Sequence, residues 1–203
     1  MAGTLDLHTL LVLKNKWGTY GVADSAAFEA LFSNIPATMV TSWHTYLRAN
    51  QPDFKTSFNH ELANIPQVVV SLQDEPVDDI PLGYHGVSGL TEYVSMFVRE
   101  TVTITVYAPS NDIARALHVM VRASMLSQLK WLIRIGYEDL QYLGGGDLGT
   151  DPDLQAEELG VYVRTQRWSS ASPVDVTTGT TFNHKNATVN HIDVPGGVKP
   201  YSP

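Results

Sequence analysis

Residues 97–133 read FVRETVTITVYAPSNDIARALHVMVRASMLSQLKWLI, and the fold is built around them. Up to Ala108, valine and isoleucine alternate with threonine, which is the period of a β-strand with one buried face. Pro109 ends that strand, and Ser110 offers a side-chain oxygen that can cap the start of a helix. The apolar residues from 113 to 133 then recur with helical spacing. We therefore predict a strand, a tight turn and one long helix that packs on the strand.

Projected down its axis, the predicted helix is apolar on two sides. One stripe is expected to face the core; it consists of Ile113, Leu117, Met120, Ser124 and Trp131. The opposite side becomes apolar past residue 125; this second stripe consists of Val119, Leu126, Leu129 and Ile133. A helix that is apolar on two sides is buried on two sides. We expect the early helices of the same chain, or another subunit, to cover the second stripe.

The rest of the chain predicts an α+β (α/β) fold, in which a small mixed or mainly antiparallel sheet is flanked by helices. Helical spacing indicates helices over residues 25–32 and 37–50, whereas residues 1–16 fit either a short helix or a strand. Alternating or β-branched runs predict strands over residues 66–72, 90–108, 136–143 and 158–168.

Three segments depart from this regular pattern. Residues 74–86 hold two prolines, two glycines and four acids, and they are predicted to form a long exposed loop. The extended run over 90–108 is longer than an ordinary strand, so we expect a bend or bulge between residues 95 and 99. After residue 168 the composition shifts to Ser, Thr, Gly, Pro and Asn. We therefore expect a single domain over residues 1–168 and an extended C-terminal arm over residues 169–203.

Composition narrows the classes of function. The 203 residues carry a net charge of −8, from 13 basic and 21 acidic residues, which argues against broad binding to nucleic-acid phosphates. Because the chain has no cysteine, disulfides, thiolate catalysis and cysteine metal sites are excluded. No apolar run is long enough to span a membrane, and the N-terminus lacks a signal-peptide pattern. We expect a soluble protein made in a cytoplasm.

Motifs for catalysis are absent. The sequence has no nucleophile elbow and no phosphate-binding loop, and its seven histidines lack metal-ligand spacing. The glycines at 144–146, followed by acids from Asp147 to Glu158, suggest a calcium loop, but the spacing of an EF-hand is missing. We expect no catalytic residue, no cofactor and no metal. A small metal-dependent hydrolase that uses this acidic loop stays open as an alternative.

Charged residues point to contacts between subunits. The arginines of the predicted core form surface salt bridges within the chain, or they pair with the acidic stretches 74–79 and 147–158 of an adjacent subunit. The residues expected at such an interface are Val119, Leu126, Leu129, Ile133, Arg115, Arg122, Arg164, Asp78, Asp79, Asp147 and Asp151.

Four motifs carry a resemblance to a known family. They are TVTITVYAP at 101–109, NDIARAL at 111–117, GGGDL at 144–148 and VYVR at 161–164. Together with the order of elements over about residues 37–168, they resemble the tail terminator (tail completion) proteins of tailed bacteriophages. The resemblance implies an α/β subunit without enzymatic activity. Six copies would form a ring that caps the finished tail tube, stops its polymerisation and joins the head side.

The same resemblance implies partners and a location. The ring would contact tail tube proteins, the sheath if the tail contracts, and connector proteins on the head side. Genomic DNA would pass through it without specific binding, helped by negative charge that repels phosphates, and no membrane is involved. The protein would be made in the host cytoplasm and reside in the tail or neck of the virion. Another neck component is the main alternative: a head-tail connector, a head-completion protein or a tail tube protein.

Overall fold

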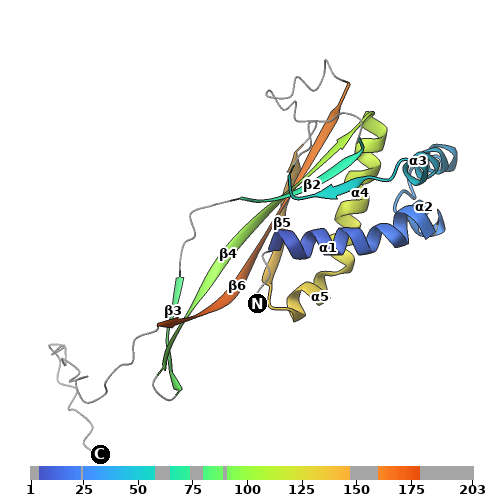
Figure 1. Cartoon of the computed structure of the whole chain (residues 1–203). Helices are drawn as coiled ribbons and strands as arrows, with labels where there is room; N and C mark the ends of the chain where they lie inside the picture. The colour runs from blue at the N-terminus through green and yellow to red at the C-terminus, as the bar shows by residue number, and fades with distance from the viewer. Residues whose placement is uncertain are drawn as a thin grey trace, which may run out of the picture. The chain divides into compact units, whose positions relative to one another are not determined.

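A computed structural model of the chain describes residues 5–23, 25–57, 65–73, 80–88, 91–146 and 160–178 (Figure 1). Internal contacts divide the chain into two units. The main unit comprises the described residues of Met1–Asp79 and Val98–Pro173, and the ribbon unit comprises those of Ile80–Phe97 and Val174–Pro203.

The helices of the main unit lie in two groups along the chain, one before the first strand and one after the long strand that ends at Ala108. Those described are α1 (Leu5–Trp17), a π-helix η1 (Gly18–Ala23), α2 (Ser25–Ala30), α3 (Ala37–Ala49), α4 (Asn111–Ser127) and α5 (Leu129–Arg134). The helices predicted over 25–32 and 37–50 are confirmed to within two residues, and the ambiguous N-terminal segment is a helix.

Six described strands form one mixed sheet. They are β1 (Asp53–Lys55), β2 (Gln67–Gln73), β3 (Ile80–Ser88), β4 (Thr91–Ala108), β5 (Glu138–Gly146) and β6 (Tyr162–Thr178). Their order is β1-β2-β4-β6-β5, and β3 also pairs with β4. The pair β1/β2 is parallel, whereas β2/β4, β3/β4 and β5/β6 are antiparallel. The predicted α+β class with a mixed sheet is thereby confirmed.

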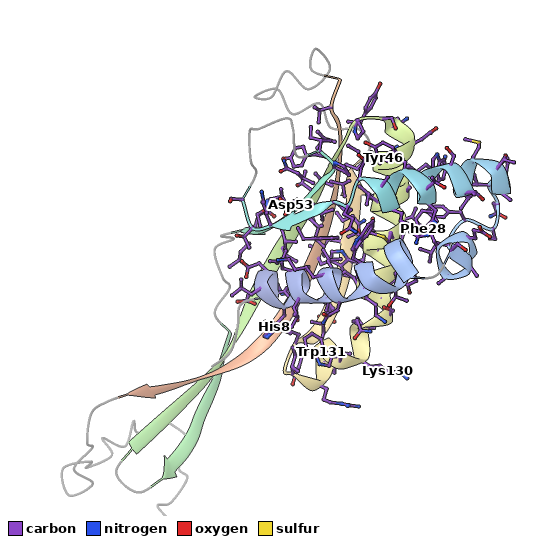
Figure 2. The ribbon with its side chains drawn as sticks, turned by 45° about the vertical axis from the view of Figure 1, so that its right-hand side comes forward. His8, Phe28, Tyr46, Asp53, Lys130 and Trp131 are labelled. Atoms are coloured by element: carbon purple, nitrogen blue, oxygen red, sulfur yellow. The ribbon has the colours of Figure 1, made fainter. Side chains whose placement is uncertain are left out.

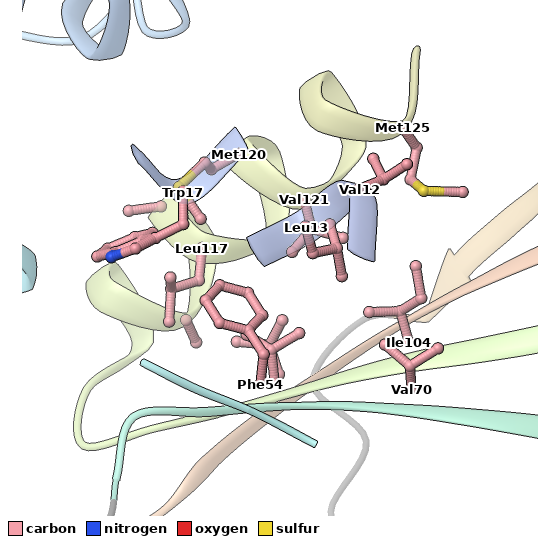
Figure 3. Close-up of a cluster of buried hydrophobic side chains, with 14 of the residues drawn as sticks. Val12, Leu13, Trp17, Phe54, Val70, Ile104, Leu117, Met120, Val121 and Met125 are labelled. Atoms are coloured by element: carbon pink, nitrogen blue, oxygen red, sulfur yellow. The ribbon is translucent and has the colours of Figure 1, made fainter. Parts of the chain in front are cut away.

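The hydrophobic core of the main unit lies between one face of the sheet and the helices α1 and α4. Alternate residues of β4 contribute to it: Val102, Ile104 and Val106 are completely buried, as the period-two pattern predicted. Figure 3 shows how three layers meet there. Val70 and Ile104 come from the sheet, and side chains of both helices lie above them, among them Val12, Leu13, Trp17, Leu117, Met120, Val121 and Met125.

The turn between β4 and α4 follows the predicted chemistry. Ser110 has an extended backbone, and its Oγ accepts a hydrogen bond of 3.3 Å from the backbone N–H of Ile113. This bond satisfies one of the N–H groups that have no partner in the first turn of a helix. Pro109 and the cap therefore set where the strand stops and where the helix starts.

The single helix predicted over 113–133 is wrong, because the structure has two helices that meet at Gln128 (φ −106°, ψ 8°). Two serines precede the break. Ser124 Oγ donates to the carbonyl of Met120 and Ser127 Oγ to the carbonyl of Ser124, both at 2.8 Å. Such bonds compete with the helical ladder and bend helices. Beyond the break, Leu132 is completely buried in the main core.

The loop predicted over 74–86 is wrong in its second half. Residues 80–86 belong to β3, while residues 74–79 lie outside the described part of the chain. β3 shifts register between Pro81 and Tyr84 and again between Tyr84 and Gly86. Proline and glycine are tolerated at such bulges, which explains why their presence did not exclude a strand. Both bulges lie in β3, opposite residues 93–96 of β4, so the bulge expected between residues 95 and 99 is not in β4, which runs as one strand from Thr91 to Ala108.

The C-terminal boundary also differs from the prediction. β6 does not end at residue 168 but continues to Thr178, so the predicted start of the arm falls inside a strand. Pairing with β5 extends past that point, through Gln141 opposite Ser169 and Glu138 opposite Ala171. The Ser-rich sequence has a low intrinsic propensity for strand structure, and pairing with β5 stabilises the strand through backbone hydrogen bonds. Residues 179–203 of the predicted arm lie outside the described residues.

Truncation of a core side chain tests this packing. Leu117→Ala removes a completely buried side chain between α4 and the sheet, so we expect the free energy of unfolding to fall by about 2–5 kcal/mol. Leu7→Ala is the matched control, because the Leu7 side chain on α1 is 53% exposed. Its free energy of unfolding should change by no more than about 0.5 kcal/mol. Urea unfolding measures both, and equal losses in the two variants would contradict the described core.

Candidate functional site

An apolar surface lies where α4 gives way to α5. Leu126 in the last turn of α4 is 52% exposed, and Ile133 in α5 is 49% exposed. Ile135 directly follows α5 and is also exposed, while Leu129, the first residue of α5, is half-buried. These four residues are called the α4–α5 patch. Single exposed apolar residues are common on protein surfaces, whereas a concentration within ten residues of one segment indicates a contact surface.

The early helices do not cover this patch. α1 packs on the opposite stripe of α4, where Val12, Leu13 and Trp17 lie near Leu117 and Met120 (Figure 3). The prediction that the early helices cover the second stripe is therefore wrong for Leu126 and Ile133. The cause is that α1 and the sheet share one face of α4, which leaves Leu126 and Ile133 about half exposed. Cover by another subunit stays a prediction.

Not every member of the second stripe is available for contact. Val119 is half-buried and packs against the main core, so it serves the fold of its own chain. Trp131, which was expected in the core stripe, is only partly buried. It lies beside His8 of α1, with ring centroids 5.9 Å apart in an edge-on arrangement (Figure 2).

Basic side chains surround the patch. Four exposed basic residues lie on α4 and α5: Arg115, Arg122, Lys130 and Arg134. Asp112 in the first turn of α4 is the only acid of these two helices. The segment 111–134 therefore carries a positive formal charge in a chain whose net charge is −8. Two other stretches are strongly acidic, because residues 74–79 hold four acids and no base, and residues 147–158 hold five acids and no base.

Two of the predicted interface arginines have partners in their own chain. Arg164 Nη2 in β6 donates a 3.0 Å hydrogen bond to Asn111 Oδ1 at the start of α4. Arg122 Cζ lies 4.5 Å from the ring centroid of Tyr142 in β5, a cation–π contact. Both contacts dock α4 onto the last two strands, so these arginines have a structural role whether or not they also meet a partner. Arg115 is exposed.

The acidic members of the predicted interface cannot be placed. Asp78, Asp79, Asp147 and Asp151 lie outside the described residues. The structure places Leu126, Leu129 and Ile133 near the junction of α4 and α5, whereas Arg115 lies near the start of α4 and Arg164 lies in β6. The acidic half of the predicted interface is known from the sequence alone.

The glycines at 144–146 belong to β5, not to a loop. A Cβ at Gly145 would lie 2.6 Å from Tyr142 Oη, 3.0 Å from His118 Cε1 and 3.0 Å from the carbonyl oxygen of Thr165. Glycine is required here because α4 and β6 approach the strand closely. A calcium-binding loop would need these glycines in a loop, but they belong to a strand. The acids from Asp147 to Glu158 lie outside the described residues.

His118 faces this close contact from α4. Its backbone carbonyl accepts a 2.5 Å hydrogen bond from Gln166 Nε2, and its buried Nδ1 has no hydrogen-bond partner among the described residues. Burial lowers the pKa of His118 below its usual range, and the nearby charges of Arg164 and Arg122 lower it further. His118 is therefore neutral at pH 7 and adds no charge to the basic surface.

A second polar group joins α1 to β4 and β5, and no sequence pattern predicted it. Glu100 Oε2 accepts a 3.0 Å hydrogen bond from the backbone N–H of Leu5, so this carboxylate from a strand caps the helix. His8 Nδ1 and Tyr137 Oη lie 2.8 Å apart. Burial raises the pKa of Glu100, and it also raises the pKa of Tyr137, with a further contribution from Glu100. The partners are more than 90 residues apart in sequence, so no local signal could have revealed them.

Two searches bear on other classes of site. Within the described part of the chain, no group of three or more His, Asp or Glu residues could hold a metal ion. Among the described helices, none is long and apolar enough to cross a membrane. Comparison with models of known protein families finds no match, and comparison with curated proteins finds none either.

A glycine substitution tests the contact between α4, β5 and β6. In Gly145→Ala the new methyl group meets a backbone carbonyl and two side chains, so we expect a loss of about 1–3 kcal/mol in the free energy of unfolding. Gly18→Ala is the control, because nothing lies within 4 Å of its Cβ position and the change should stay within about 1 kcal/mol. If Gly145→Ala proved as stable as Gly18→Ala in urea, the packing described around β5 would be wrong.

The titration of His118 tests its surroundings. We expect its NMR midpoint to lie below the usual value of about 6.5, and Arg122→Gln to raise it partway because burial remains. The unfolded chain binds this proton more readily than the folded one. The contribution of His118 to the free energy of unfolding is therefore present above about pH 6.5 and is lost as the pH falls toward the folded pKa. His118→Gln assigns the signal, and a midpoint at or above 6.5 would contradict the description.

Proposed function

We propose that this chain is a structural subunit of the neck of a tailed bacteriophage, acting as a tail terminator. Several copies, six by resemblance, form a ring that caps the finished tail tube, ends its polymerisation and presents a surface to the head side. The observation that carries the proposal is the α4–α5 patch. Leu126 and Ile133 are about half exposed on a basic surface of a chain that already buries a complete core elsewhere.

The placement of the resembling motifs supports the proposal. TVTITVYAP ends β4, NDIARAL begins α4, and VYVR runs into β6. The structure makes these one packed unit in which Arg164 of the VYVR motif bonds to Asn111 of the NDIARAL motif. Three of the four motifs that carry the resemblance thus meet in one packed unit, which supports the proposal.

Partners follow from the same proposal. The ring would bind tail tube proteins on one side, with a sheath if the tail contracts, and connector proteins on the other. DNA would pass through without specific binding, which suits a net charge of −8 on each subunit. The role proposed is mechanical, with no enzymatic step. The protein would act in the virion at the tail or neck.

A charge placed in the patch tests the assembly. Leu126→Asp changes a side chain that is 52% exposed and lies outside the core, so the melting temperature of the dissociated chain should fall by only a few degrees. An unpaired carboxylate in an apolar contact costs more than about 1.4 kcal/mol, so the dissociation constant for self-association should rise by more than about tenfold. Light scattering against concentration and thermal unfolding measure the two effects.

Met39→Asp is the matched control for this substitution. Met39 is 42% exposed on α3, outside the patch, so the variant should assemble like the original chain. A strictly monomeric original chain at micromolar concentration, with tail tube ends present, would contradict the ring proposal. Electron microscopy separates the alternatives within the neck, because a tail tube protein would stack into long tubes whereas a terminator stays as single rings.

A further inference from the structure

We propose that the β-ribbon of one copy docks on the α4–α5 patch of the next copy. The ribbon consists of β3 and residues 91–97 of β4, that is, the described residues of Ile80–Phe97 in the ribbon unit. This inference rests on the proposed function, because it names the second half of the contact that would close a ring.

The ribbon is an antiparallel pair whose backbone register is known. Ile80 lies opposite Phe97, Tyr84 opposite Val94, and Ser88 opposite Thr91. Only one of the 18 residues from 80 to 97 is charged, Glu92, whereas half of them are large and apolar. The apolar residues are Ile80, Leu82, Tyr84, Val87, Leu90, Tyr93, Val94, Met96 and Phe97.

A ribbon of this kind needs cover. β4 pairs with β6, whose described end Val174–Thr178 belongs to the same unit, so among the described strands β3 is the edge of the ribbon. Soluble proteins normally protect such an edge with charges, and β3 carries none of the charged residues Asp, Glu, Lys or Arg. The composition of the ribbon therefore fits a segment that is buried in an assembly.

The two surfaces complement each other in charge as well as in polarity. The patch is apolar and is bordered by the exposed basic residues Arg122, Lys130 and Arg134. The ribbon is apolar and is preceded directly by four acids and no base, at Asp74, Glu75, Asp78 and Asp79. Apolar residues would supply the binding energy, while the opposite charges would fix the register between copies.

A second copy of this chain is the occupant that this arrangement favours. The patch and the ribbon are different surfaces, so their contact is heterologous, and heterologous contacts between identical chains generate rings when the rotation closes. Two patches facing each other would instead bring basic residues together. A ring therefore needs a second surface that is apolar and not basic, as the ribbon is.

Chemical cross-linking tests the contact, because the chain has no cysteine and only introduced thiols react. One variant carries Ile133→Cys in the patch. Two others carry Tyr93→Cys and Val94→Cys, which cover both faces of the ribbon because successive strand residues point to opposite sides. Each ribbon variant is mixed with the patch variant and treated with a short bis-maleimide. The control mixture uses Ser42→Cys, on the exposed side of α3, in place of Ile133→Cys.

We expect linked dimers from the patch variant mixed with at least one ribbon variant, about tenfold or more above the control mixture, because docking raises the local thiol concentration. The double variant with both thiols in one chain should give a ladder of linked copies that ends at the size of the ring. If neither mixture exceeds the control while light scattering still shows oligomers, the docking inference is wrong and the ring proposal stands. If a ribbon variant links mainly to itself, or the double variant links only within single chains, the docking inference is also wrong. A chain that never assembles would remove both proposals together.

Discussion

The packing of α4 on the inner face of β4 is the contact on which the rest of the structure depends. Val102, Ile104 and Val106 present one continuous apolar face, and the turn at Ser110 returns the chain directly onto it. A strand and a helix joined by so short a turn bury their apolar surfaces against each other at little cost in loop entropy. The other strands and α1 extend this two-layer core on both sides.

One consequence of this packing is a helix with an uncovered side. The sheet and α1 occupy the same face of α4, and α1 is tied to the strands at its start through Glu100 and Tyr137. The outer face of α4 is divided along its length. Its polar part docks on β5 and β6 through Arg122 and contacts around His118, whereas its last turn leads into the exposed apolar patch.

Function follows from how charge and apolar surface are distributed. The helical segment 111–134 is basic, while nine of the 21 acids of the chain lie in two short stretches of the sequence, 74–79 and 147–158. Such separation within one chain makes different regions of identical copies complementary. The proposed assembly of copies would use this complementarity.

The sequence alone determined the strand–turn–helix unit, the cap at Ser110, the core stripe of α4 and the α+β class, because all of these arise from local periodicity and turn chemistry. Only the tertiary structure decided that the long helix breaks at Gln128, that residues 80–86 form a strand and that β6 continues to Thr178. The length of β6 depends on its pairing with the earlier strand β5, whereas β3 pairs with the strand that directly follows it and the helix breaks where Ser124 and Ser127 bond to nearby carbonyls. For the candidate site, the helical projection of the sequence identified Leu126 and Ile133 as part of a second apolar stripe. Only the packing of α1 on the other face of α4 showed that no described helix covers these two residues.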